Sequence, residues 1–595
     1  MHKHSFHIPV MGIGFTADTP LKVAHLGIDS VISLVDDELL EQLRKVYSDK
    51  LKLPFVSIKN TLDDFRAKRI TSYLNLIHRI TYDKFNNLKN LNDNCINELK
   101  EYLSLLPNGK NLITEFKNKY KCTLNKESLK QWLENKISIG SIDVNIMTKV
   151  DKDNYKDGEK LNVIYNDAHA ALRGFAESDL SSSLVLSAGM NPKLYSYIEQ
   201  FEDFYPDKKG TLKKKIILKV SDYRSALIQG KYLAKKGIWI SEYRIESGLN
   251  CGGHAFATDG FLMGPILKQF SDSKIELSKT LDVIFKEALA QKNKEIPSVV
   301  LPVKISAQGG VGTSQEHSFL QEHYKINSVG WGSPFLLVPE ATTVDNVTLK
   351  QLEKAEEKDL YLSDISPLGV PFNNLRGNTK DIEKEKNINK GRPGSSCPKK
   401  FLSLDKEYKK EGLCSASRQF QYLKLKELDD KELSIDQYQK EYNKITVKSC
   451  ICVGLGTSAL INNSLKTKKE GTGVSVCPGP NMAYFSKTIK LKEMVDHIYN
   501  ETNVIMRERP HMFIKELNIY MNYLTNQIRE SKGIIDKKRN KYFKRFINNM
   551  INGVDYYLNV FTNESNFFKD HKVSICNELI EHKKQLLMYS EAHIG

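Results

Sequence analysis

The sequence contains no uninterrupted apolar run of about 18 residues, the length that a membrane-crossing helix needs, so we expect no membrane-spanning segment. The stretch from Met1 to Phe15 lacks the basic, apolar and small-residue order of a signal peptide. We therefore assign the nine cysteines to a reducing compartment, the cytoplasm, where cysteines serve as thiols, metal ligands or catalytic groups rather than as disulfides.

The bulk composition is that of a globular protein with more than one structural unit. Hydrophobic residues make up 40% of the chain and charged residues 27%, and 595 residues are too many for a single ordinary core. The net charge of +16 invites a nucleic-acid interpretation. However, the chain is crowded with Lys, Asn and Ile, as AT-rich genomes favour, and such lysines cover solvated faces. We therefore do not expect a nucleic-acid partner.

Eight apolar runs alternate with segments of helical spacing along the first part of the chain. Buried strands that alternate with helices indicate a parallel sheet, and this many in series favour a closed barrel over an open sheet. We predict an α/β fold with a (β/α)8 TIM barrel over residues 1–350. The predicted strands are Phe6 to Met11, Ser30 to Leu34, Ser141 to Met147, Ser183 to Ser187, Lys215 to Val220, Ile238 to Ser241, Val299 to Ser306 and Ser328 to Trp331.

Three further regions are predicted around the barrel. Residues 36–135 are rich in Leu, Lys, Asn and Asp with helical spacing, which indicates a helical insertion. Residues 351–485 form a cysteine-rich extension, and residues 486–595 form a helical C-terminal region.

Small and polar residues stand at the ends of the predicted strands. They include Asn145, Gly252-Gly253-His254, Gln308-Gly309-Gly310 and Gly332-Ser333. The carboxyl ends of barrel strands are where active sites are built, and late glycine turns suit a phosphate. A histidine beside a glycine pair is well suited to proton transfer, so His254 is the predicted catalytic residue.

Gly12, Gly14 and Ala17, with Asp36 after the second strand, also match a dinucleotide-binding pattern. That pattern requires its glycines to open a helix, whereas the helix signal here begins only at Pro20. A short loop at the end of the first strand is the favoured interpretation.

Six segments in order resemble the successive strand ends of the FMN-dependent nitronate monooxygenases, a family that includes flavin-type enoyl-acyl-carrier-protein reductases. They are HIPVMGIG, VNIM, LVLSAGMNPKLY, EYRIESGLNCGGHAF, VKISAQGGVGT and VGWGSPFLLVPEATT. The resemblance implies an FMN-binding barrel, with NAD(P)H as the donor in the reductase branch. Its flavin residues here would be Met11, Gly12, Asn145, Gly253, Gly309, Gly310, Gly332 and Ser333, and His254 matches the family's active-site histidine.

The chain departs from the family before its paired glycines. The family commonly has Glu-Ala at this point, whereas this chain has Leu249-Asn250-Cys251, and its nearest acid, Glu246, is displaced. The substrate and the nicotinamide partner therefore do not follow from the resemblance.

Five cysteines lie within the extension: Cys397, Cys414, Cys450, Cys452 and Cys477. Cysteine followed by proline, together with Cys-x-Cys, is compatible with an iron–sulfur cluster or a structural zinc, which is our prediction, although buried or redox thiols remain the alternative. Cys450 and Cys452 flank Ile451 in a predicted strand, followed by a glycine turn from Gly454 to Ala459.

We predict an FMN-dependent reductase of an activated alkene, with a small-molecule or acyl-carrier-bound substrate. Oxidation of a nitronate is the first alternative. An RNA-binding or RNA-modifying protein that uses the basic run Lys532 to Arg545, with Tyr542 and Phe543, is the second. A barrel that has lost its cofactor and serves as a scaffold is the third. Substrate, electron donor and oligomeric state do not follow from the sequence.

Overall fold

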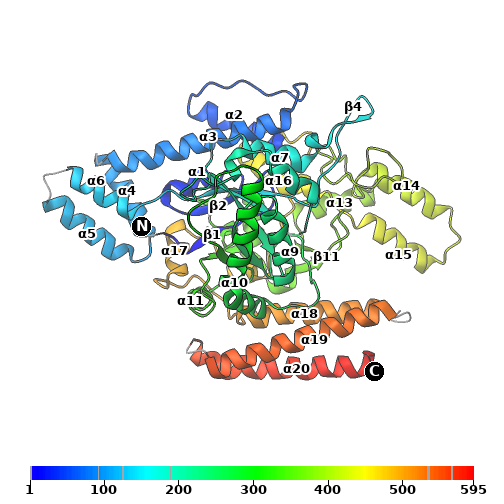
Figure 1. The fold of residues 1–595 in the computed structure, drawn as a ribbon. Helices are drawn as coiled ribbons and strands as arrows, with labels where there is room; N and C mark the ends of the chain where they lie inside the picture. The colour runs from blue at the N-terminus through cyan, green and yellow to red at the C-terminus, as the bar shows by residue number, and fades with distance from the viewer. Residues whose placement is uncertain are drawn as a thin grey trace.

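The structure is a computed structural model that describes residues 3–90, 93–122, 126–187, 189–531, 537–564 and 567–594. Eight parallel strands close into a barrel in the order β1-β10-β9-β8-β7-β6-β3-β2 at the centre of the molecule (Figure 1). All eight predicted strands are present in the predicted order, so the TIM-barrel fold is confirmed. Their bounds are β1 Phe6–Ile8, β2 Asp29–Ser33, β3 Ile142–Ile146, β6 Ser182–Leu186, β7 Lys214–Val220, β8 Ile240–Glu246, β9 Lys304–Gln308 and β10 Ser328–Gly330.

Each strand differs from its predicted bounds by at least one residue, and β8 and β9 differ most. β9 begins at Lys304 rather than Val299. Pro302 stands just before it and has no backbone N–H to donate to a neighbouring strand. β8 continues past Ser241 to Glu246 because Tyr243 and Ile245 are also fully buried. Two of the polar residues that seemed to end β8 pair with each other: Arg244 Nη2 lies 2.7 Å from Glu242 Oε1, and the two side chains are 4% and 13% exposed.

The barrel has an inner and an outer apolar layer. Val31, Val185 and Ile217, from β2, β6 and β7, form a small cluster separate from the main core. We assign this cluster to the barrel interior, because alternate residues of each strand face inward. The main core lies between the strands and the surrounding helices, and it extends without a break into the C-terminal region.

Seven helices follow the strands of the barrel. Their caps are encoded locally: Thr313 and Glu316, for example, form a capping box at the start of α11, and the Asp222 side chain accepts from Ser225 N at 2.6 Å at the start of α9. Their bounds are α1 Thr19–Val23, α7 Asp167–Ala176, α8 Pro192–Ile198, α9 Tyr223–Ala234, α10 Met263–Gln291, α11 Ser314–His323 and α12 Asn346–Lys354.

Helices also fill the segment between β2 and β3, where the helical insertion was predicted. α3 packs closely against α7, since Thr71 Oγ1 donates to Gly174 O at 2.9 Å, and α4 to α6 project to one side (Figure 1). The bounds are α2 Asp37–Lys50, α3 Phe65–Asn87, α4 Asp93–Leu105, α5 Gly109–Cys122 and α6 Lys126–Lys136. A small hairpin, β4 Tyr155–Lys156 and β5 Glu159–Lys160, precedes α7.

The cysteine-rich extension contains a hairpin and four helices. α14 and α15 project from the side opposite α4 to α6 (Figure 1). The bounds are β11 Leu360–Ser363, β12 Phe372–Leu375, α13 Thr379–Asn389, α14 Arg418–Asp429, α15 Ile435–Thr446 and α16 Ile451–Asn462.

The prediction of a strand at Cys450 to Cys452 is wrong, because α16 begins there. The predicted glycine turn from Gly454 to Ala459 lies inside the same helix. α16 is buried from Ile451 to Leu460, and a short apolar run buried on every side cannot be told from a buried strand by its periodicity.

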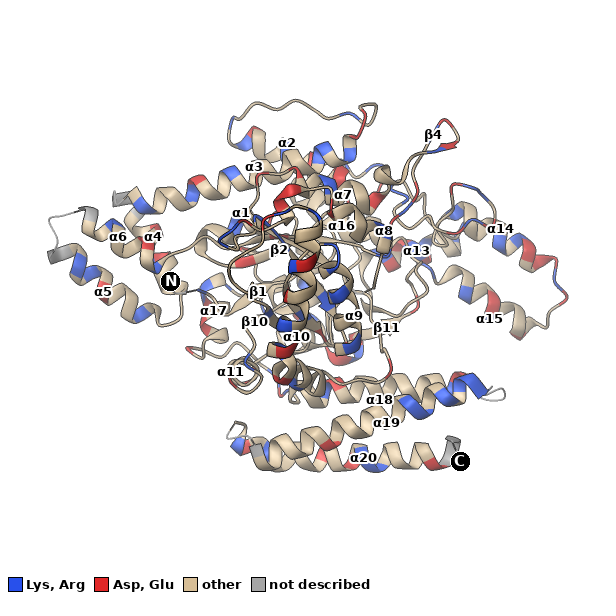
Figure 2. Ribbon diagram, viewed as in Figure 1, with Lys and Arg blue, Asp and Glu red and all other residues tan. Residues whose placement is uncertain are grey.

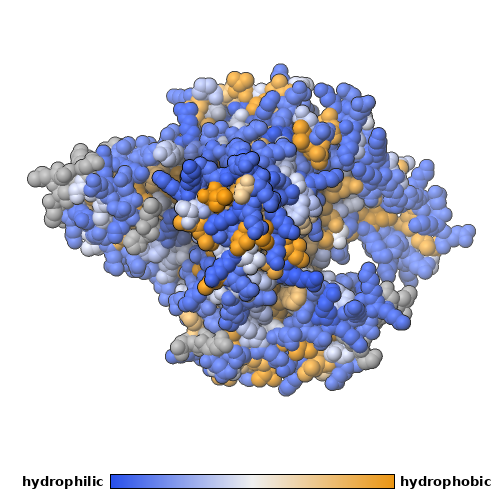
Figure 3. Space-filling view, in the orientation of Figure 1, coloured by the Kyte–Doolittle hydropathy of each residue, from blue (hydrophilic) through white to orange (hydrophobic). Residues whose placement is uncertain are grey.

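Four helices make up the C-terminal region, and α18 to α20 lie side by side along one edge of the molecule (Figure 1). Their bounds are α17 Leu491–Ile498, α18 Met512–Glu530, α19 Lys537–Asn559 and α20 Lys572–Ile594. Within the described residues, no single helix is long and apolar enough to cross a membrane; one pair bent by 45°, α15 with α16, meets the criterion by length and composition. The face drawn in Figure 3 is mostly hydrophilic, with hydrophobic side chains in small groups.

Candidate active site

A cavity of about 310 Å³ opens at the carboxyl ends of the barrel strands. Its volume is at the lower end of the range for small-molecule and cofactor sites. The structure brings together at this one cavity every residue that the sequence predicts for the flavin site. These lining residues are Met11, Gly12, Asn145, Gly253, His254, Gly309, Gly310, Gly332 and Ser333.

His254 is held in one orientation beside the cavity. Its Nε2 lies 2.7 Å from Ser366 Oγ, and its ring contacts the Phe372 ring edge-on at a centroid distance of 5.0 Å. Burial lowers the pKa of His254 to about 4, so its imidazole is neutral at physiological pH. A neutral imidazole can accept or relay a proton, but it does not supply a standing positive charge.

The partners of His254 come from the extension, which covers this side of the barrel mouth. His254 and Phe372 face each other in an antiparallel bridge that is made by their neighbours: Ala255 N donates to Pro371 O at 2.9 Å, and Asn373 N donates to Gly253 O at 2.9 Å. The segment that carries Phe372 is therefore a wall of the site.

Glycine is required at three positions of the cavity wall. Gly253, Gly309 and Gly310 have φ values of +80°, +122° and +81°, which other residues adopt only with strain. A Cβ at Gly310 would lie 2.1 Å from Asn250 Nδ2, whereas a Cβ at Gly253 would meet nothing within 4 Å. Gly253 is thus the position where the backbone leaves open space in the cavity.

A buried ion pair fixes the turn that follows β9. The Glu316 carboxylate accepts from Gly312 N at 2.9 Å, from Met512 N at 2.7 Å and from Arg509 Nη1 at 2.6 Å. Arg509 also donates to Gly310 O. Burial alone would raise the pKa of the Glu316 carboxyl, but the Arg509 guanidinium holds it below its usual value. The C-terminal region therefore clamps the glycine turn in place.

The sequence-based prediction assigned no role in the site to Lys219, Glu246 or Gln308, which also line the cavity. Lys219 and Glu246, at the ends of β7 and β8, form an ion pair at 2.9 Å, and Gln308 Nε2 donates to Glu246 at 2.5 Å. Their positions at strand ends were the signal that could have identified them. Asn145, which was predicted, carries a buried Oδ1 with no hydrogen-bond partner among the described residues. An orphaned acceptor at the cavity wall suits a ligand N–H.

Three cysteines line the cavity, Cys251, Cys452 and Cys477, and the last two were predicted as metal ligands. Cys477 lies apart from the other four predicted ligands, and its carbonyl accepts from Gly253 N at 3.1 Å. Burial raises the pKa of the Cys477 thiol to about 12 and raises that of Cys251 well above its ordinary value. Both are therefore neutral thiols and poor nucleophiles.

The other four predicted ligands, Cys397, Cys414, Cys450 and Cys452, do meet. Cys397 is in hydrogen-bonding contact with Cys414 and Cys450, and Cys450 with Cys452. However, no group of three or more His, Cys, Asp and Glu side chains in the described ranges is arranged to hold a metal ion. The arrangement therefore does not support the predicted metal site.

The basic run of the C-terminal region falls at the start of α19, which packs partly against the core. Residues 532–536 of the predicted run lie outside the described part of the chain. Beyond them, basic residues gather at the start of α19 (Figure 2), but Phe543 is buried, Tyr542 packs against it, and Arg545 pairs with Asp259 at 2.7 Å. Phe543 therefore cannot stack on a base, whereas Tyr542 is half-buried, and the RNA-binding alternative stays a prediction.

Comparison with known proteins gives similarities of low degree. No protein-family model and no curated protein sequence matches the chain. Among solved structures, FabK from Thermotoga maritima has a TM-score of 0.36 and 11% identity over 88% of this chain and 96% of its own.

Two other solved structures are similar to the same degree. The enoyl reductase domain of MlnA, from the macrolactin biosynthesis cluster of Bacillus amyloliquefaciens, has a TM-score of 0.33 and 14% identity over 73% of this chain and 88% of its own. Nitroalkane oxidase from Streptomyces ansochromogenes has a TM-score of 0.34 and 8% identity over 83% and 94%. Similarities this low do not establish a common activity, so the function is argued from the site itself.

Proposed function

We propose that the protein is an FMN-dependent oxidoreductase that reduces an activated alkene, such as an enoyl thioester. One observation supports the proposal: the glycine turns, the buried Asn145 Oδ1 without a hydrogen-bond partner and the neutral His254 all line one cavity. They stand at the strand ends that carry the family resemblance. When bound, FMN would supply hydride transfer to or from its ring system.

The residues present fit this cofactor. The turns at Gly309-Gly310 and Gly332-Ser333 bring backbone N–H groups to the cavity, where a phosphate can accept from them. Gly253 leaves open space beside the glycine pair, and Asn145 offers an unused acceptor to a ring N–H. The cavity wall is otherwise largely apolar, as a flat aromatic ring requires.

His254 would hold or move the proton that accompanies hydride transfer. Ser366 fixes its ring from outside the cavity, and burial keeps it neutral. A neutral imidazole positioned in this way can donate a hydrogen bond that orients the substrate carbonyl, or relay a proton by accepting one at one ring nitrogen as it releases one from the other. The apolar surroundings exclude competing water.

Anaerobic flavin spectroscopy tests the reaction class. We expect NADH or NADPH to bleach the visible absorbance of bound flavin, and a crotonyl thioester to restore it without oxygen. His254→Ala should bind flavin equally but slow the restoration. If neither nicotinamide nor a dithiol bleaches the flavin, while an alkyl nitronate does and oxygen restores it, the nitronate alternative replaces the reductase.

A further inference from the structure

A second cavity lies beside the first, between the cysteine-rich extension and the loop that follows β3. Its volume is about 1210 Å³, above the upper end of the range for small-molecule sites, about 1,000 Å³. Phe401 and Leu402 line the first cavity, whereas Lys400 and Ser403 line the second, and no described residue lines both. The second cavity is therefore a separate space, and the proposed function makes no use of it.

Positive charge exceeds negative charge in the wall of the second cavity. The cations that line it are Lys152, Arg392, Lys400, Lys409, Arg418 and Lys426. The acids are Asp153, Glu411 and Asp429. Asp153 is already neutralised from outside the wall, since it pairs with Lys160 at 2.9 Å and with Lys406 at 3.1 Å. Among the described residues, Lys409 is the only cation of the wall that forms an ion pair, with Glu411 at 3.7 Å. The excess charge favours a bound anion.

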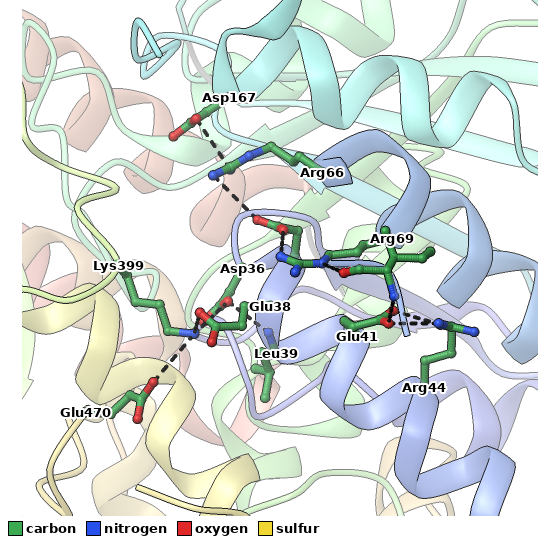
Figure 4. Close-up of polar contacts among 12 residues, drawn as sticks. Asp36, Glu38, Leu39, Glu41, Arg44, Arg66, Arg69, Asp167, Lys399 and Glu470 are labelled. Carbon is green, nitrogen blue, oxygen red and sulfur yellow. Dashed lines mark hydrogen bonds and ion pairs between the residues drawn. The ribbon is translucent and has the colours of Figure 1, made fainter. Parts of the chain in front are cut away.

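The segment that carries Lys400 is held in place by the lysine before it. The Lys399 side chain is 4% exposed and pairs with Asp36 at 3.2 Å and with Glu38 at 3.0 Å, which fixes the segment to the start of α2 (Figure 4). Lys400 lines the cavity and forms no ion pair with any described residue. One lysine therefore serves the fold, and the next is available to a ligand.

Arg418, the first residue of α14, carries a donor that is not satisfied. Its Nε is buried without a hydrogen-bond partner among the described residues. Its backbone is fixed, because Arg418 N donates to Ser395 O at 2.8 Å and a Cβ at Gly394 would lie 2.7 Å from Arg418 Cα. Arg392, two residues before Gly394, lines the same cavity. A buried guanidinium N–H without an acceptor favours an anion that supplies one.

Lys152 brings a further positive charge from the loop after β3. Its Nζ donates to Asn154 Oδ1 at 2.8 Å. Burial lowers the pKa of Lys152, and the positive charges of Arg66 and Lys400 lower it further, whereas Asp167 opposes them. Lys152 and Lys400 therefore repel each other across the cavity wall, and an anion between them would remove this repulsion.

One face of α14 lines the cavity. Arg418, Tyr422, Leu425 and Lys426 stand at positions i, i+4, i+7 and i+8, which share one face of a helix. Tyr422 is 65% exposed, and its ring contacts no other aromatic ring of the described residues. Because Arg418 and Tyr422 are one turn apart, their Cβ atoms are separated by about 5–6 Å. The helix thus presents a guanidinium and a flat apolar ring side by side.

We propose that the second cavity binds a nucleotide through its diphosphate group and its base. Arg418, Arg392, Lys400 and Lys152 hold the phosphates, whose several charged oxygens suit guanidinium and ammonium groups. The base stacks on Tyr422, with Leu425 beside it. A simple anion such as phosphate would leave Tyr422 and most of the volume unused. The inference goes beyond the proposed function and does not depend on a bound flavin.

Calorimetric titration of the full-length protein tests the proposal with ADP and UDP, a purine and a pyrimidine nucleotide. We expect at least one of them to bind at about one per chain with a Kd of about 100 µM or lower, and at least about 10-fold more tightly than pyrophosphate. No binding of either nucleotide up to about 1 mM, or binding no tighter than that of pyrophosphate, would overturn the proposal.

Variants locate the site. Arg418→Met should weaken nucleotide binding about 10-fold or more, because it removes charged hydrogen bonds. Tyr422→Ala should weaken it about 5-fold or more through the lost stacking, and this exposed position tolerates the change without loss of the fold. Two matched controls should bind as the wild type does: Lys440→Met, at an exposed lysine of α15, and Tyr82→Ala, at a tyrosine of α3 that is 50% exposed.

A reciprocal variant separates the two cavities. Gly253→Leu, which fills the first cavity, should leave nucleotide binding unchanged. If Gly253→Leu abolishes nucleotide binding while Arg418→Met and Tyr422→Ala do not affect it, the nucleotide occupies the first cavity and the proposal is wrong. An equal loss in Lys440→Met and Arg418→Met would also contradict it, because the effect would then follow net charge alone.

Competition experiments identify the form in which the nucleotide reaches the cavity. NADH and coenzyme A each carry an ADP group, so both should displace ADP. A Kd for one of them at least about 10-fold below that of ADP would make that molecule the occupant, and similar values for all three would make it a free nucleotide. Failure of both to displace bound ADP would contradict recognition of the shared group.

Discussion

We expect the loss of Arg509 to disturb the candidate active site strongly, although the side chain acts through the turn after β9 rather than from within the cavity. Its guanidinium pairs with the Glu316 carboxylate at 2.6 Å, and the two side chains are 5% and 2% exposed. Removing one partner of a buried ion pair costs about 3–5 kcal/mol, because the other charge remains buried without compensation. We expect Arg509→Met to lower the free energy of unfolding by that amount at neutral pH.

The pH dependence identifies Glu316 as the cause. In the wild type the pKa of Glu316 is lowered, so its contribution to stability is present above the unfolded-state pKa and is lost as pH falls through the folded-state pKa. Without Arg509, burial would raise that pKa, and protonation would relieve the unpaired charge. The difference between wild type and Arg509→Met should therefore shrink from about pH 7 to about pH 5.

Urea denaturation followed by tryptophan fluorescence measures this effect. Trp331 reports on the relevant part of the barrel, since its Nε1 donates to His317 Nδ1 of α11 at 3.1 Å. The double variant Glu316→Gln/Arg509→Met should recover part of the loss. A destabilisation below about 1 kcal/mol, or one unchanged between the two pH values, would refute the assignment of a buried, stabilising pair.

Two further predictions concern buried titratable groups. His254→Ala should lower turnover by about 10²-fold with flavin still bound. Because burial lowers the pKa of His254 to about 4, the wild-type pH–rate profile should show no His254 ionisation between about pH 5 and pH 8. An inflection near about pH 6.5 that disappears in His254→Ala would contradict this. Burial lowers the pKa of Lys214, whose Nζ donates to Ser178 O at 2.8 Å, to about 7. The unfolded state then binds more protons than the folded state between about pH 7 and pH 10, so stability should rise with pH in this window. Lys214→Met should abolish this rise, measured as the midpoint of thermal unfolding. An unchanged rise in the variant would assign it to other groups.

The strand ends were predictable from the sequence because the barrel topology itself brings them together. Asn145, His254 and Gly310 lie far apart in the chain, yet each follows an apolar run, and the carboxyl ends of parallel strands share one face. The fold class alone was therefore sufficient to predict that these side chains are neighbours.

The residues that complete the site were not predictable in this way. Ser366 is 112 residues from His254, and Arg509 is 193 residues from Glu316. Both belong to irregular segments without periodicity, and their contacts arise only when the extension and the C-terminal region fold over the barrel. The same holds for Cys452, whose helix resembled a buried strand because it is apolar on every side.

The central claim is that the cavity at the strand ends holds FMN, and an equilibrium titration of the protein with FMN tests it most directly. A matched pair of glycines sharpens the test: Gly253 and Gly377 have φ values of +80° and +72°, and a Cβ at either meets nothing within 4 Å. Gly253→Leu and Gly377→Leu should thus carry similar backbone strain, about 1–2 kcal/mol, but only Gly253 lines the cavity. We expect about one FMN per chain in the wild type and in Gly377→Leu, and at least about 100-fold weaker binding in Gly253→Leu. Absence of FMN binding by the wild type, or equal affinities in the two variants, would contradict the claim.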